Sequence, residues 1–583
     1  MFNFVTLTPI LRVAGHFKRT PLIITHRLAH SPSSPPFTHV QTISEYSESQ
    51  YEEFFRYSSG RWLWDEDIQL RNRYKRFNVS ELKATATASV GANGCVSMTK
   101  IAEGGFNKVF RLVMDDNSTV IARIPYPNVG RSCKTTASEV AAMEFARTIL
   151  GIPVPNVLAW SGKAGSPVGS EYILMEEATG RQLGEVWDDL KLADKLKIVE
   201  EIVAIEEKLL SLSFTRFGNL YLVDDAFPGC EKAEIASDVP QSQRKEVESR
   251  FVIGPVSNND FWDKERASLA INRGPWKCPE DYIKAIARRQ IAWISRYATA
   301  ATPKPRYDMF MLAECYSQNS ADAHIELYNK FLDVSDYLLP NNKELNRSTI
   351  WHWDIHAPNL FVEGNKVTGL IDWQDNWAGP LFLQARRPKL VAYNGDIMLE
   401  LPEHYKDIED EDERARIRAQ VETSIVLGAY ESNTKRTNAV LHEIFDLPHG
   451  RTRKETVVFS TNTWDDDIIP FRQCLIRVAR HWDEMKNEVA CPINFTDEEL
   501  KAHYQEGEGW NEQADFWVAL RGFVERDGWT SNEDYERALE TFAELRELGL
   551  RDLTGDERAH FERRTRWAAR NGSGWIMLTI HLN

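Results

Sequence analysis

The pattern of apolar and polar positions predicts a strand-rich segment followed by long helices. Within the strand-rich segment, residues 138–147 place apolar side chains at three- and four-residue spacing, which predicts a helix. Residues 190–212 show the same spacing over a longer stretch, and residues 179–350 are predicted to be mostly helical. Apolar or alternating runs predict strands at residues 98–102, 108–114, 120–125 and 171–178.

Beyond residue 388 the chain carries four charge-rich helical patterns, which predict a helical cap that completes a large lobe. Their Glu and Arg residues are interpreted as solvated faces with local ion pairs, each worth about 0.3 kcal/mol. An acidic wall that attracts a cationic ligand is the alternative, and the pattern leaves both open. Residues 224–257 mix Pro, Gly, Ser and charge, which predicts an irregular excursion. The helical patterns lie at residues 409–429, 470–487, 511–527 and 531–548.

The segment HWDIHAPN at residues 352–359 has the spacing of a phosphoryl-transfer loop. In such a loop an Asp accepts the proton of the attacking hydroxyl, and an Asn five residues later binds magnesium. Asp354 and Asn359 fill these places, with Asp372 as the second metal ligand. Residues 360–371 predict a strand, a tight Gly-Asn turn and a strand, so both ligands would flank one hairpin. His352 is the other candidate catalytic residue, with support of the loop as its expected role.

The nucleotide half of such a site is expected earlier in the chain. Gly104 and Gly105 separate two predicted strands, and two glycines let backbone amides approach a phosphate closely. Taken alone, a Gly-Gly pair between strands is more often a plain hairpin turn, and only its position favours a phosphate contact. Arg123 stands among apolar residues of the next strand, where it would contact the phosphates. Glu139 could face Arg123 as an orienting carboxylate, and Glu144 is the competing choice.

The predicted strand at residues 171–178 ends in Glu176 and Glu177. In a kinase-like arrangement this strand end is the hinge between two lobes. Backbone groups there, rather than side chains, are expected to contact the adenine. Glu176 and Glu177 are therefore included among the candidate nucleotide-binding residues.

Together these motifs resemble the aminoglycoside phosphotransferase superfamily, and within it they are most similar to the fungal altered inheritance of mitochondria protein 9 family. The resemblance covers about residues 51–388. It implies an α+β, protein-kinase-like two-lobed fold that binds ATP and Mg²⁺ in mitochondria. Arg123 departs from the usual Lys, and Trp373-Gln374 stands where protein kinases have Phe-Gly. The predicted divisions of the chain are residues 1–44 (mitochondrial targeting presequence), 45–97 (N-terminal extension), 98–178 (small nucleotide-binding lobe), 179–400 (large catalytic lobe) and 401–583 (helical C-terminal part of the large lobe).

Composition restricts the partners of the chain. A net charge of -16 argues against nucleic acid as the main partner, because a phosphate-binding surface needs a basic patch. No apolar run approaches the length of a membrane span, so no transmembrane segment is expected. The seven cysteines show no paired short spacing, which indicates neither a zinc site nor a disulfide framework.

Residues 1–44 contain no Asp or Glu but include Arg12, Lys18, Arg19 and Arg27. A basic segment rich in Ser, Thr and apolar residues is typical of a mitochondrial presequence that the import machinery binds. An ordinary tail is the alternative, because prolines interrupt any long helix. The expected location is the mitochondrion, with the matrix preferred.

The favoured function is therefore transfer of the ATP γ-phosphate to a hydroxyl of a small-molecule acceptor. The alternative is an ATP-binding mitochondrial scaffold with weak or no activity, which Arg123 motivates. Protein phosphorylation is disfavoured, because the Phe-Gly pair and a recognisable activation segment are missing. A superfamily with many substrates does not identify the acceptor.

Overall fold

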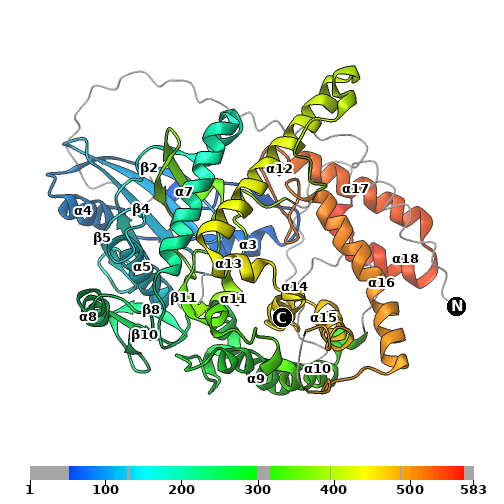
Figure 1. Cartoon of the computed structure of the whole chain (residues 1–583). Helices are drawn as coiled ribbons and strands as arrows, with labels where there is room; N and C mark the ends of the chain where they lie inside the picture. Colours follow the sequence, from blue (N-terminus) through cyan, green and yellow to red (C-terminus); the bar gives the residue numbers. More distant parts are fainter. Residues whose placement is uncertain (1–50, 128–131, 299–315, 394, 486–488, 570–583) are drawn as a thin grey trace. The chain divides into compact units, whose positions relative to one another are not determined.

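The computed structural model describes residues 51–127, 132–298, 316–393, 395–485 and 489–569 (Figure 1). The chain folds as two compact units. Of the described residues, the larger unit takes those within 76–298 and 317–495, and the smaller takes 51–75, 316 and those within 496–569. The predicted presequence at residues 1–44 lies outside the described residues.

The larger unit contains a five-stranded antiparallel sheet in the order β2-β3-β4-β6-β5. Every second residue of β3 and β4 is buried, because alternate side chains point to opposite faces of a sheet. The strands predicted from the sequence are thus confirmed as parts of one sheet. They are β2 (Cys95–Glu103), β3 (Asn107–Met114), β4 (Thr119–Pro125), β5 (Val157–Ser161) and β6 (Tyr172–Met175).

Two helices accompany this sheet. α4 (Val79–Val90) begins at Asn78, whose side chain accepts a hydrogen bond from the backbone N–H of Glu81 (3.1 Å). It ends at Gly91, which adopts a left-handed φ of 74°. α5 (Ser132–Thr148) contains the helix predicted at residues 138–147 and contacts β5 and β6. The sheet and α5 form the small β-rich lobe with one key helix.

Residues 219–254 form a second, three-stranded sheet in the order β8-β10-β9. The prediction of an irregular excursion at residues 224–257 is therefore wrong. Backbone pairing between β8 and β10 orders the segment, and the Phe251 ring packs edge-on against Phe145 of α5, with ring centroids 5.5 Å apart. The elements are β8 (Asn219–Leu222), β9 (Glu231–Lys232), α8 (Gln241–Arg250) and β10 (Phe251–Gly254).

The rest of the larger unit is mainly helical. α7 (Leu192–Leu210) confirms the long amphipathic pattern at residues 190–212, and it packs against α12 (Glu411–Thr437). The other helices are α6 (Leu183–Val186), α9 (Pro279–Tyr297), α10 (Ala321–Val334), α11 (Leu381–Gln384), α13 (Ala439–Phe445), α14 (Gly450–Phe459) and α15 (Ile468–Arg480). The strands are β7 (Arg181–Gln182), β11 (Ser348–Ile350), β12 (Leu360–Glu363), β13 (Lys366–Leu370) and β14 (Ala378–Pro380).

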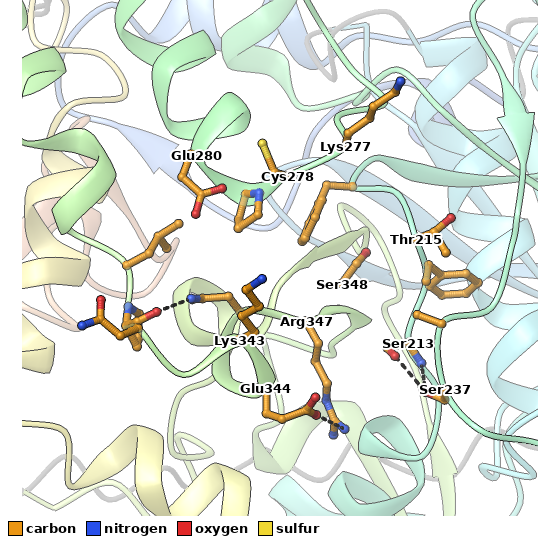
Figure 2. A pocket seen from close by; sticks show the side chains of 18 of the residues that line it. Ser213, Thr215, Ser237, Lys277, Cys278, Glu280, Lys343, Glu344, Arg347 and Ser348 are labelled. Carbon is orange, nitrogen blue, oxygen red and sulfur yellow. Dashed lines mark hydrogen bonds and ion pairs between the residues drawn. The ribbon is translucent and has the colours of Figure 1, made fainter.

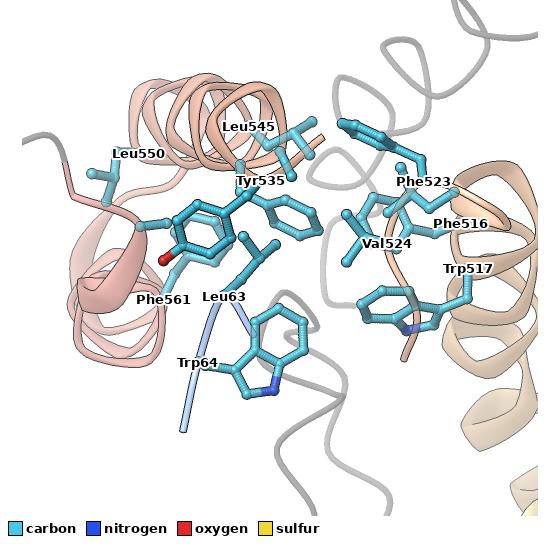
Figure 3. Packing of buried hydrophobic residues seen from close by; sticks show 14 of the residues in the cluster. Leu63, Trp64, Phe516, Trp517, Phe523, Val524, Tyr535, Leu545, Leu550 and Phe561 are labelled. Carbon is cyan, nitrogen blue, oxygen red and sulfur yellow. The ribbon is translucent and has the colours of Figure 1, made fainter. Parts of the chain in front are cut away.

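The smaller unit has its own hydrophobic core (Figure 3). Trp64 packs there against Trp517, Phe542 and Trp567, with ring centroids 4.9 to 6.3 Å apart. Trp62 is 1% exposed and Trp64 is 7% exposed, so both tryptophans are core anchors. The elements are α2 (Glu52–Phe55), β1 (Arg61–Trp62), α3 (Glu66–Arg73), α16 (Asp497–Leu520), β15 (Trp529–Thr530), α17 (Tyr535–Asp552) and α18 (Gly555–Arg564).

The unit boundary divides two of the predicted segments. Of the extension predicted at residues 45–97, the described residues 51–75 belong to the smaller unit, and Leu63 and Trp64 share a core with α16, α17 and α18. The predicted C-terminal segment is divided at residue 496. Thr496 starts α16 through a capping box with Glu499, so this helix begins well before the pattern at residues 511–527.

Within the described residues, no helix combines the length and the apolar character that a membrane crossing requires.

Candidate active site

The loop between β11 and β12 carries the predicted catalytic residues. Asn359 closes a short 3₁₀ turn at residues 357–359, and its side-chain Nδ2 donates to the backbone oxygen of Asp354 (3.1 Å). The side chain of Asp354 is 18% exposed. The loop therefore holds its Asp and its Asn in one hydrogen-bonded arrangement.

His352 fastens this loop to the segment that carries Asp372. Its Nε2 donates to the backbone oxygen of Ile371 (3.1 Å), and its ring packs edge-on against Trp373 at 4.9 Å. Burial lowers the pKa of His352, so the ring is neutral at pH 7. This geometry gives His352 a positioning role.

The two predicted metal ligands flank one hairpin, as the sequence indicated. β12 and β13 pair antiparallel, and Gly364 takes the left-handed turn position with φ 64°. At the open end of the hairpin, the backbone N–H of Ile371 donates to the oxygen of Asn359 (3.0 Å). Asp372 follows with φ 64°, a sparsely populated conformation for a residue other than glycine.

These two side chains fit a magnesium ion. Mg²⁺ prefers oxygen ligands, and it is usually held by one or two carboxylates together with phosphate oxygens. The Asp372 side chain is 47% exposed and can reach a ligand. Asn359 uses Nδ2 within the loop, which leaves its Oδ1 as the atom for the ion.

On the small lobe, Arg123 of β4 forms an ion pair with Glu139 of α5. Their side chains are 11% and 3% exposed. Glu144, the competing choice, instead pairs with Arg250 (2.6 Å). Burial raises the pKa of Glu139 to about 7, against the opposing effect of the Arg123 guanidinium.

Gln374 joins the two lobes at this point, a role that no sequence pattern predicted. Its Oε1 accepts hydrogen bonds from Nδ2 of Asn107 (3.0 Å) and from Nη2 of Arg123. The same Nη2 lies 3.9 Å from Oδ1 of Asp372. The start of β3, the middle of β4 and the Asp372 segment thus meet at one amide.

The Gly104-Gly105 turn connects β2 and β3. Gly104 N–H donates to the backbone oxygen of Asn107 (3.0 Å), so the turn is a hairpin. A Cβ added to either glycine would meet nothing within 4 Å, and neither glycine has a left-handed φ. Packing within the chain therefore does not require glycine here, which is compatible with space kept for a ligand.

The predicted hinge follows β6. The carboxylate of Glu177 binds Arg111 (2.8 Å), and that of Glu176 lies 3.7 Å from Arg147. The backbone N–H of Glu176 donates to the oxygen of Asn156 (3.0 Å), so this residue can offer only its carbonyl to an adenine. Both carboxylates thus contact arginines of this chain, and a backbone contact to adenine stays a prediction.

Lys389 is a second residue of the site that no sequence pattern predicted. Its Nζ lies 2.6 Å from Oδ1 of Asp354 and forms an ion pair with the predicted base. His356 lies 3.5 Å from the same oxygen. Lys389 is 35 positions beyond Asp354 in the chain, and no local pattern marks the contact.

A cavity of about 890 Å³ lies elsewhere in the larger unit (Figure 2). Its lining includes Arg347 and Ser348 at the start of β11 but none of the predicted site residues. Charged side chains of both signs line this cavity. Among them, Arg347 and Glu344 form an ion pair with a separation of 3.8 Å. Of the predicted site residues, Arg123, Glu139 and Asp372 meet instead around Gln374.

Comparison with known proteins gives several similarities. The model of the "Phosphotransferase enzyme family" matches residues 279–382, a span that contains His352, Asp354, Asn359 and Asp372. A subtelomeric hrmA-associated cluster protein of Aspergillus fumigatus is 30% identical over 491 residues, covering 78% of this chain and 92% of that protein. The altered inheritance of mitochondria protein 9 of Yarrowia lipolytica is 24% identical and covers 85% of this chain and 88% of its own.

Among solved structures, a thermostable mutant of aminoglycoside phosphotransferase APH(4)-Ia in complex with ADP and hygromycin B is similar over 68% of this chain and 98% of its own. Its identity is 12% and its TM-score 0.32.

Proposed function

Because this chain belongs to the phosphotransferase enzyme family, together with the altered inheritance of mitochondria protein 9 relatives, we propose that it transfers the γ-phosphate of ATP to a hydroxyl of a small molecule. Family membership and the two-lobed α+β fold describe the framework of the protein. What we propose is the reaction, its cofactors and its acceptor.

The observation that carries the proposal is the meeting of both lobes at Gln374. Phosphoryl transfer depends on positioning and on charge neutralisation more than on covalent chemistry by the protein. Gln374 links the Gly-Gly hairpin, through Asn107, and the Arg123–Glu139 pair to the segment of Asp372. The candidate phosphate, metal and base positions therefore belong to one connected arrangement.

Each residue has a role in the proposed reaction. ATP bound with Mg²⁺ supplies the transferable phosphoryl group. Asp354 orients the acceptor hydroxyl and takes its proton. Asn359 and Asp372 hold the metal with their side-chain oxygens, and Arg123, aligned by Glu139, stabilises the nucleotide phosphates. Gly104 and Gly105 allow backbone amides to approach those phosphates.

The proposed location is the mitochondrion. Several relatives are named as mitochondrial proteins. The acid-free, basic composition of residues 1–44 supports a transit peptide that the import machinery binds.

Titration with ATP, with and without magnesium, tests the proposal through the thermal stability of the protein. A ligand that binds only the folded state raises the melting temperature. We expect stabilisation that requires magnesium and is lost in Asp372→Ala. Absence of any stabilisation at millimolar ATP would remove the basis of the proposed activity.

One observation favours a second candidate, an ATP-binding scaffold with weak or no activity. The Arg123 guanidinium contacts Glu139 and Gln374 and lies near Asp372, so donors that would serve phosphates are engaged within the protein. Nucleotide would then set the packing of the two lobes without transfer. Magnesium-dependent ATP binding without release of ADP, over a broad acceptor screen, would favour this candidate.

A further inference from the structure

The segment after α11 lies directly against the catalytic loop. The backbone N–H of Lys389 donates to the oxygen of Ile355 (3.0 Å), and its side chain reaches Asp354. Three positions earlier, the guanidinium of Arg386 lies over the ring of Trp353, 5.5 Å from its centroid. Trp353 directly precedes Asp354 and is 37% exposed. An acceptor whose hydroxyl reaches Asp354 therefore comes close to two cations and an aromatic face.

Cationic side chains gather beside Asp354. Arg386 makes no ion pair with any residue that the structure describes, and its side chain is exposed. Arg387, in contrast, is paired with Glu431 (2.9 Å). Lys454 donates to the backbone oxygen of Ala385 (2.7 Å). Burial lowers the pKa of Lys454 to about 7, and the neighbouring Arg386 and Arg387 add to the shift.

Carboxylates at the start of α12, which could have formed a wall for a cationic acceptor, pair with arginines of the same helix. Glu411 lies 3.0 Å from Arg418, and Glu413 lies 2.6 Å from Arg416. These are solvated pairs on one helix, as the first of the two sequence interpretations expects.

We propose that the phosphate acceptor is an anion, a hydroxyl compound whose carboxylate or phosphate group binds Arg386 and Lys389 beside Trp353. This assignment rests on the proposed phosphotransfer and narrows its substrate class. Arg binds carboxylate and phosphate through paired N–H groups, and the aromatic face of Trp353 provides a surface for the carbon skeleton.

The ion pair between Lys389 and Asp354 gives the anion a second effect. An acceptor anion attracts Lys389 and draws its ammonium away from Oδ1 of Asp354. That oxygen is then free to take the hydroxyl proton while the acceptor oxygen bonds to the γ-phosphorus and the bond to ADP breaks. Lys389 thus acts as a positioning residue for the base as well as a binding residue.

A matched set of probes tests the charge of the acceptor. Glycerol, glycerate, glycerol 3-phosphate and choline all carry hydroxyl groups and differ in charge. Their binding to the protein with magnesium and the non-hydrolysable analogue AMP-PNP is measured by calorimetry. We expect one or both anions to bind, with glycerol and choline weaker. The comparison of glycerate with glycerol 3-phosphate distinguishes a carboxylate site from a phosphate site.

Arg386→Gln is the decisive variant, and Arg416→Gln, which removes an exposed α12 arginine, is its control. We expect Arg386→Gln to weaken binding of the anion by about tenfold or more, as for the loss of a charged hydrogen bond. The control should bind it as the unmodified protein does. Lys389→Gln should weaken it as well, and the thermal stability of each variant shows whether it is folded.

Three results would each overturn the inference. Choline could bind at least as tightly as the anions, the anions could fail to bind at millimolar concentration, or they could bind Arg386→Gln as tightly as the unmodified protein. The AMP-PNP titration of the same samples reports separately on the proposed function. If AMP-PNP fails to bind while an anion binds through Arg386, the anion site stands and phosphotransfer from ATP does not.

Discussion

Arg123 and Glu139 form a buried ion pair that joins β4, the central strand of the five-stranded sheet, to helix α5. Burying two charges is costly, and the pair is stabilising only relative to the loss of one partner. The raised pKa of Glu139, about 7, reflects this cost of burial. The pair is therefore expected to serve the geometry of the site more than the stability of the fold.

Replacing one member of this pair should destabilise the small lobe. Arg123→Ala leaves the carboxyl group of Glu139 buried without its cation, and we expect a cost of about 3 kcal/mol. Hydrogen exchange of β4 and α5 amides measures this locally. The double variant Arg123→Met with Glu139→Leu should recover much of the loss. Arg111→Ala is the control in the same sheet, because its partner Glu177 is 36% exposed, and it should cost less than about 1 kcal/mol.

Asp354→Asn should separate catalysis from nucleotide binding. The amide cannot take the hydroxyl proton, so turnover should fall by about 10²- to 10⁴-fold, whereas magnesium-dependent stabilisation by ATP should remain. Release of ADP in the presence of an accepted hydroxyl compound measures the first, and thermal stability the second. Asp224→Asn, outside the site, is the control. Unchanged turnover in Asp354→Asn would show that another group is the base.

Local spacing was enough to predict much of the site. The loop at residues 352–359, the following hairpin and the alternating strands depend on residues that are near one another in the chain. The two candidate partners of Arg123, Glu139 and Glu144, also lie on one helix. The structure shows that Glu139 faces Arg123, whereas Glu144 pairs with Arg250.

Contacts between distant residues could not be predicted in the same way. Gln374 meets Arg123 across 251 positions, and Lys389 meets Asp354 from another segment, so neither contact has a local pattern. The core that Trp64 shares with Trp517 likewise joins segments far apart in the chain. The sheet at residues 219–254 was missed because turn residues and charges interrupt its short strands.

Asn219 of β8 should be important for the stability of the site. Its buried Nδ2 donates to Oγ of Ser138 (2.8 Å), next to Glu139, and to Oγ of Ser257 (3.0 Å). Its Oδ1 accepts from the backbone N–H of Ser257 (3.1 Å). Asn219→Ala leaves these groups unsatisfied, and we expect a loss of about 2–3 kcal/mol.

Hydrogen exchange at α5 and at residues 372–378 is the measurement for this variant, because Nδ2 of Asn219 also lies 3.3 Å from the backbone oxygen of Asn376. Asn365→Ala, which removes one long side-chain contact of 3.4 Å to Asp194, is the matched control and should change little. Equal protection in the two variants would contradict a bridging role for Asn219.

The buried carboxyl group of Glu206 should make stability depend on pH. Glu206 lies on α7 with no exposed surface, and Tyr430 of α12 donates a hydrogen bond to it (3.0 Å). Burial raises its pKa from 4.5 to about 8. Between these values the unfolded chain releases the proton while the folded protein keeps it, so the unfolded state binds fewer protons and the free energy of unfolding falls as pH rises.

The fall should be on the order of a few kcal/mol between pH 4.5 and 8, from the size of the shift, and should level off above pH 8. Glu206→Gln keeps an acceptor for the Tyr430 hydroxyl and does not titrate, so it should remove this component of the slope. Glu207→Gln, an exposed neighbour on the same helix, should leave it. Melting temperatures of the three proteins across this pH range provide the comparison, and parallel curves for all three would mean that Glu206 is ionised in the fold.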